Sequence, residues 1–117
     1  MLAGVAGLGL LLTACSPTSG SSRGTAGDGV VDVVASTSVY GDIVSSIGGD
    51  KVRVSSIISR TSQDPHSYEA TTQDKLAVSK AELVVENGGG YDAFIDTLAT
   101  DTGLESGNII NAVDASG

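Results

Sequence analysis

The residues with the clearest chemical potential lie together in the segment Asp64-Pro65-His66-Ser67-Tyr68-Glu69. It holds the only histidine of the 117 residues and one of the two prolines. Proline fixes its own φ and favours an extended residue before it, so the imidazole projects from a stiffened backbone. Neutral imidazole is the commonest side-chain ligand for zinc and related metals. The segment therefore indicates metal binding by His66, against the plainer alternative of a surface or capping histidine.

A catalytic role is the other chemistry open to His66. Asp64 could orient the ring and Ser62 or Ser67 could act as nucleophile, but a serine next to its base in sequence rarely meets it in geometry. No oxyanion donor is identifiable in the sequence. The pattern G-x-S-x-G at residues 20–24 lacks the strand-turn-helix context that this motif needs. We therefore predict that the protein is not an enzyme.

Three glycines at positions 88–90 offer a second possible site, because such a turn can present amide groups to an anion at a helix N-terminus. A dinucleotide fingerprint requires G-x-G-x-x-G, whereas here the chain continues with Tyr91-Asp92. The carboxylate of Asp92 at the helix start would repel phosphate. The pattern favours a tight strand-to-helix turn over an anion site.

Composition and charge exclude other classes of function. Fourteen acidic against six basic side chains give a net charge of −8, which argues against a nucleic-acid partner. The single cysteine, Cys15, excludes an intramolecular disulfide and has to be explained by its position.

The N-terminal part differs from globular sequence. Residues 2–12 form an apolar run too short to span a bilayer but typical of a secretory signal. The run ends in Leu12-Thr13-Ala14-Cys15, which resembles a bacterial lipobox. We predict a signal peptide over residues 1–14, a lipidated Cys15 and a flexible Ser/Gly linker over 15–29. No Lys or Arg precedes the run, which leaves open a start codon upstream of Met1.

Alternating elements are predicted over residues 30–117 and must position the histidine. Predicted strands cover residues 30–35, 52–58, 83–85 and 109–113, with helices between them and a polar loop at 100–108. The helices show apolar faces at Val39, Tyr40, Ile43, Val44 and Ile47, and at Tyr91, Phe94, Ile95 and Leu98. This alternation predicts an α/β fold with a parallel sheet and helices on both faces. His66 follows the second strand, at the carboxyl edge where such sheets bind ligands.

Caps define two of the predicted helices. Ser36, Thr37 and Ser38 offer N-caps for the first helix. Thr71 and Asp74 resemble a capping box for a helix that runs to about residue 81.

Five fragments in this order, behind the lipobox, resemble the zinc/manganese-binding receptor lipoproteins of bacterial ABC importers. The similarity runs from about Val33 to Leu98. The fragments are Val34-Ala35-Ser36-Thr37-Ser38, Asp42-Ile43-Val44, Ile47-Gly48-Gly49-Asp50-Lys51-Val52, the His66 segment with Asp74, and Leu83-Val84-Val85-Glu86-Asn87-Gly88.

The resemblance implies a fold of two α/β lobes with one metal ion in the cleft between them, and this chain corresponds to the N-terminal lobe. In the family the ligands are typically three histidines, or two histidines and a glutamate, plus a carboxylate of the second lobe. His66 matches the first histidine, and the others come from later sequence. Asp64 or Glu69 could orient the ring or bond nearby amides. Ala70 and Thr72 stand where prolines are common, which concerns the stiffness of the loop.

The function implied is that of a substrate-binding lipoprotein, here a fragment, that captures zinc or manganese for an ABC importer. Its partners would be the importer permease and the membrane, through lipidated Cys15 on the extracytoplasmic side of the cell membrane. The alternative is a surface lipoprotein with an adhesive or structural role. The sequence leaves the choice between zinc and manganese open.

Overall fold

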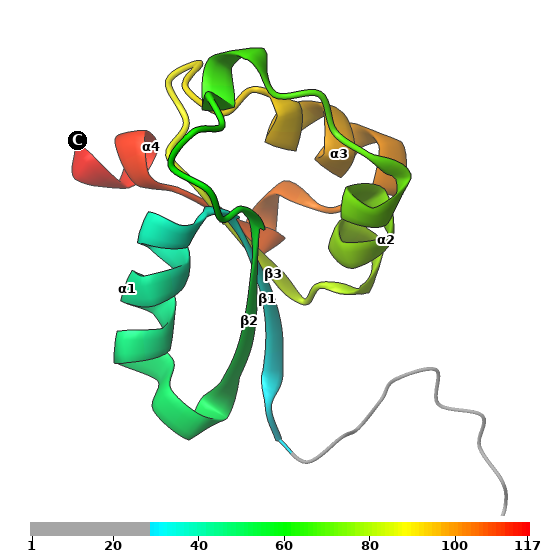
Figure 1. Ribbon diagram of the computed structural model, residues 1–117. Coiled ribbons are helices and arrows are strands. Elements are labelled where there is room, and N and C mark those ends of the chain that lie inside the picture. The colour runs from blue at the N-terminus through cyan, green and yellow to red at the C-terminus, as the bar shows by residue number, and fades with distance from the viewer. Residues whose placement is uncertain (1–28) are drawn as a thin grey trace, which may run out of the picture.

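The computed structural model describes residues 29–117, which contain a four-stranded parallel sheet of order β2-β1-β3-β4 (Figure 1). The strands are β1 (Val31–Thr37), β2 (Val52–Ile58), β3 (Leu83–Glu86) and β4 (Ile109–Asn111). The α-helices are α1 (Ser38–Gly48), α2 (Thr72–Lys80), α3 (Phe94–Thr102) and α4 (Ala112–Ser116). Short 3-10 helices cover Gly49–Lys51, Pro65–Ser67 and Ser106–Asn108. The predicted α/β class is confirmed, whereas the signal peptide and Cys15 fall outside the described residues.

The sheet is built on β1, which pairs in parallel with β2 on one side and β3 on the other. Val31 lies opposite Val52 and Thr37 opposite Ile58, while Val33 lies opposite Leu83. Helix α1 covers one face of the sheet, and α2 and α3 cover the other (Figure 1). Because all strands are parallel, their carboxyl ends meet at one edge, and the His66 segment follows β2 there.

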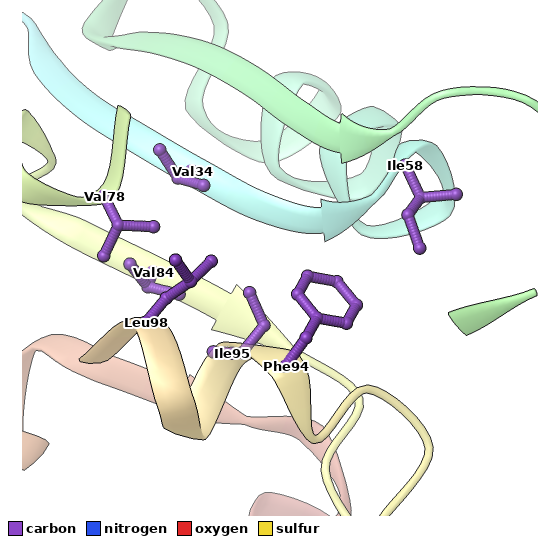
Figure 2. Packing of buried hydrophobic residues seen from close by; sticks show 7 residues of the cluster. All are labelled: Val34, Ile58, Val78, Val84, Phe94, Ile95 and Leu98. Carbon is purple, nitrogen blue, oxygen red and sulfur yellow. The ribbon is translucent and has the colours of Figure 1, made fainter. Parts of the chain in front are cut away.

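The hydrophobic core lies between the sheet and the pair α2 and α3 (Figure 2). β-branched residues of the strands meet three apolar side chains of α3 in this layer. The cluster comprises Val34, Ile58, Val78, Val84, Phe94, Ile95 and Leu98. The predicted apolar face of α3 is thus confirmed at three positions. Tyr91, the fourth, lies in the turn before the helix and is 38% exposed.

Helix α1 packs differently from the prediction. Of its predicted apolar face, Val39, Ile43 and Ile47 are exposed, whereas Tyr40 and Val44 are half-buried. Its only buried residue is Gly41. A Cβ added at Gly41 would collide with the side chain of Ser56 in β2. A Cβ at Gly48 would lie 2.5 Å from Cγ2 of Val52. Small residues therefore let the helix backbone approach β2 closely.

The ends of several elements also differ. Ser36 and Thr37 belong to β1, and Thr37 is the N-cap residue of α1, one of the three predicted. Its side chain makes no cap bond to the helix. Strand β4 ends at Asn111, whose side chain instead accepts a bond from the amide of Asp114 and caps α4. Helix α3 continues through Thr102, into the segment predicted as a polar loop. Within residues 29–117, no helix has the length and apolar character needed to cross a membrane.

The close approach of α1 to β2 can be tested at Gly48. Gly48→Ala should lower the free energy of unfolding by about 1–3 kcal/mol, because the new methyl group overlaps Val52. Gly107→Ala is the matched control, since a Cβ there meets no atom within 4 Å. Urea denaturation followed by circular dichroism gives both values. Equal stability of the two variants would contradict the packing described here.

Candidate metal-binding site

His66 lies on the 3-10 turn Pro65–Ser67, after β2 at the carboxyl edge of the sheet. Its side chain is 61% exposed. The predicted placement in a loop, with the imidazole open to solvent, is confirmed. The ring is therefore accessible to a ligand that arrives from solvent.

The carboxylate of Asp64 holds the histidine in two ways. Oδ1 of Asp64 accepts a bond from the backbone N–H of His66 at 3.0 Å and lies 3.0 Å from Nδ1 of the ring. These bonds, the backbone one first, lower the pKa of Asp64. A proton on Nδ1 would be donated to Asp64, which leaves the lone pair of Nε2 for a metal. Asp64 thus combines both roles that the sequence left open, whereas the exposed Glu69 makes no side-chain bond to residues 29–117.

The segment after His66 is anchored to α2. Tyr68 packs its ring against Phe94, with centroids 4.8 Å apart, and donates its hydroxyl hydrogen to Oδ2 of Asp74 at 2.8 Å. Partial burial and this bond raise the pKa of Tyr68 to about 12. Thr71 and Asp74 form the predicted capping box, with Thr71 N donating to Asp74 at 2.8 Å and Asp74 N to Thr71 Oγ1 at 3.2 Å. The loop is therefore fixed at its far end as well.

A second aromatic ring reaches His66 from the turn between β3 and α3. The ring centroids of Tyr91 and His66 are 5.0 Å apart and the planes lie at 80°, an edge-to-face contact. Sequence reasoning missed this contact because it placed Tyr91 on a helical apolar face. The three preceding glycines were the available signal, since they put Tyr91 in a turn at the sheet edge.

The glycine turn itself is closed by Asp92. Gly88, Gly89 and Gly90 adopt φ values of 77°, 62° and 82°, which favour glycine. The carboxylate of Asp92 is fully buried and accepts the backbone N–H groups of Asn87 at 2.7 Å and Gly88 at 2.9 Å. The predicted tight turn is confirmed. Asp92 takes up amide groups that an anion would otherwise need, a role that the sequence alone did not reveal.

A cleft of ≈ 530 Å³ opens beside His66, between its segment and α3. Its lining includes His66, Tyr68 and Phe94, and the exposed pair Lys75 and Asp101, whose Nζ and Oδ2 are 3.3 Å apart. Among residues 29–117, no three His, Cys, Asp or Glu side chains are gathered as a metal site. The described part of the chain therefore supplies one imidazole, and a tetrahedral ion needs further ligands.

Comparison with known proteins identifies the family of the chain. The family model of the zinc-uptake complex component A, periplasmic (ZnuA), matches residues 33–117. The chain belongs to this family. This family is named for a component of a zinc-uptake complex, and it is not a known enzyme family.

Curated relatives carry matching names. The manganese ABC transporter substrate-binding lipoprotein scaA of Streptococcus gordonii is 39% identical over 77 residues, which cover 66% of this chain and 24% of the relative. The lipoprotein PsaA of Streptococcus pneumoniae is 39% identical over 79 residues, covering 68% and 24%. The chain spans about a quarter of the length of these curated relatives.

Solved structures share the fold. The manganese-bound periplasmic metal-binding protein of Candidatus Liberibacter asiaticus is 30% identical with a TM-score of 0.63, covering 74% of this chain and 32% of that protein. The periplasmic zinc-binding protein TroA of Treponema pallidum is 24% identical, also with a TM-score of 0.63, and covers 74% and 30%. The parallel sheet and its helices are therefore those of periplasmic metal-binding proteins.

Glu86 is a buried carboxylate at the same edge of the sheet that sequence reasoning did not single out. It is 3% exposed, and its Oε1 accepts a bond from Nδ2 of Asn111 at 2.8 Å, which joins β3 to β4. Burial, and secondly the negative charge of Asp96, raise the pKa of Glu86. Ionised Glu86 is therefore less favourable in the folded than in the unfolded state.

This difference predicts a pH-dependent effect of Glu86→Gln. The pKa of Glu86 is higher in the folded than in the unfolded state. The wild type therefore loses stability as pH rises through the range between these two pKa values, whereas the variant with neutral glutamine does not. Its amide oxygen can still accept the bond from Asn111. Urea midpoints should show Glu86→Gln more stable than wild type at pH 7.5, with the gain shrinking towards about pH 4. The exposed Glu105→Gln is the control, and a gain in Glu86→Gln that is constant with pH would contradict the assignment.

Proposed function

We propose that this chain is the N-terminal lobe of a substrate-binding lipoprotein that captures a divalent metal ion for a bacterial ABC importer. The observation that carries the proposal is the exposure of the His66 imidazole together with its contact to Asp64. The ring stands exposed at the sheet edge, with Asp64 3.0 Å from Nδ1, so that Nε2 is left for a metal. Membership of the zinc-uptake family supports this chemistry.

The proposed cargo is zinc or manganese, because an imidazole nitrogen binds both ions. The relatives' names include manganese, and the name of the family includes zinc. A carrier has to release its ion, and a site divided between two lobes can open for release. We infer that His66 is one ligand, and that the others belong to the rest of a longer receptor.

The proposed location is the extracytoplasmic side of the cell membrane, with the importer permease as partner. Lipidated Cys15 would be the anchor, and the lipoprotein names of the curated relatives support it. Family membership favours transport over the adhesive alternative.

Zinc titration of the metal-free chain tests His66 as a ligand. Because the chain has a single histidine, zinc-induced shifts of imidazole NMR signals report this site alone. Binding should be weak, since one imidazole and water fill the coordination shell. In calorimetry above the histidine pKa, His66→Ala should remove the zinc-binding heat, and Asp64→Ala should weaken binding by about tenfold.

Glu69→Gln is the matched control, because it removes an exposed carboxylate from the same loop and should leave binding unchanged. Zinc binding by His66→Ala with wild-type affinity would show that His66 is not a ligand, and the proposed function would lose its chemical basis.

Lipidation of Cys15 has a separate test. Mass spectrometry of the membrane fraction of a bacterial host should detect a diacylglyceryl group on Cys15 as the mature N-terminus. Cys15→Ser should abolish this species and release the chain from the membrane. Recovery of an unmodified wild-type soluble chain that retains residues 1–14 would refute the anchor.

A further inference from the structure

The contact between His66 and Tyr91 joins two loops at the carboxyl edge of the sheet that are distant in sequence. We propose that Tyr91 is a positioning residue, whose ring fixes the plane of the His66 imidazole so that Nε2 is held ready for the metal. The inference rests on the proposed function, in which His66 is a ligand.

The hydrogen bond that Asp64 accepts from the ring cannot fix the ring plane alone. It restrains one atom, Nδ1, whereas the terminal torsion of a histidine side chain has a broad energy minimum. Because the ring is exposed, few neighbouring atoms limit its rotation about this torsion. An edge-to-face contact at 5.0 Å and 80° adds a second restraint from another direction. A ring that is already oriented loses less conformational freedom when the metal binds.

Tyr91 suits this role because its backbone is firmly held. Its N–H donates to the carbonyl of Gly88 at 3.1 Å, inside the turn that the buried Asp92 closes. Asn87, at the start of the turn, accepts the hydroxyl hydrogen of Tyr40 from α1 at 2.6 Å. The backbone oxygen of Asn87 accepts the N–H of Val113 from α4 at 2.9 Å. The turn is thus hydrogen-bonded to both α1 and α4.

The ring of Tyr91, and not its hydroxyl group, is the part that makes the contact. The hydroxyl has no hydrogen-bond partner among residues 29–117. Phenylalanine should therefore replace tyrosine without loss, whereas alanine should not. This pair of variants separates orientation by the ring from direct ligation by the phenol oxygen.

The first experiment uses the metal-free 117-residue chain. A nuclear Overhauser effect between the ring protons of Tyr91 and those of His66 should be present in the wild type. With Tyr91→Phe it should persist between the two rings, and with Tyr91→Ala the His66 ring protons should change their chemical shifts. Absence of the wild-type effect would overturn the inference without reference to any metal.

The second experiment titrates the same three chains with zinc alone and follows the His66 imidazole signals. Tyr91→Ala should weaken zinc binding by roughly two- to tenfold, the contribution of an aromatic pair, and Tyr91→Phe should match wild type. Circular dichroism of each variant checks that the fold is retained.

The outcomes separate the two proposals. If zinc binding requires His66 but is unchanged in Tyr91→Ala, only the positioning role is overturned. The same holds if Tyr91→Phe loses affinity as Tyr91→Ala does, because the hydroxyl would then be the active group. If zinc binding survives His66→Ala, the proposed function fails and this inference fails with it.

Discussion

The carboxyl edge of the sheet, where the candidate site lies, depends on the hydrogen bonds that the buried carboxylate of Asp92 accepts. Its two oxygens accept the backbone N–H groups of Asn87 and Gly88, which otherwise would be left without partners in a turn of three left-handed glycines. Strand β3 can then turn directly into the segment that leads to α3. The same turn receives Tyr40 from α1 and places Tyr91 against His66. One charged side chain, used only for backbone bonds, therefore organises several elements around the candidate ligand.

A side chain that coordinates a metal has to be both oriented and accessible, and His66, the proposed ligand, shows both properties by different means. Accessibility comes from its place on a short turn at the carboxyl edge of a parallel sheet, where the ring remains exposed. Orientation comes from Asp64 on the same loop and from Tyr91 across the edge. The loop itself is held by Tyr68 and Asp74, because the phenol bonds the helix cap while its ring joins the core. The candidate site thus combines an exposed imidazole with a loop that is anchored at both ends.

Helix α1 shows why periodicity did not predict its packing. Its sequence carries two faces with helical spacing, one of large apolar residues such as Ile43 and one of small residues around Gly41 and Gly48. A pattern of hydrophobicity selects the first face for burial. The sheet instead receives the second, because the absence of side chains lets the backbone of the helix lie close to β2. The distance between α1 and β2 determines which face of the helix is buried, and that distance is a property of the packed molecule.

The sequence by itself determined the features whose causes are local. The β-branched runs became strands, Thr71 and Asp74 formed their capping box, the three glycines made a tight turn, and Pro65 placed His66 in a loop after β2. The tertiary structure decided the partners of these residues. Tyr91 meets His66, Asp92 closes the turn as a buried charge, and Glu86 bonds Asn111 across two strands. The contacts of Tyr91 and Glu86 join segments far apart in the chain, so they depend on how the sheet brings its carboxyl ends together. The bonds of Asp92 stay within one turn, but its complete burial is a property of the packed molecule.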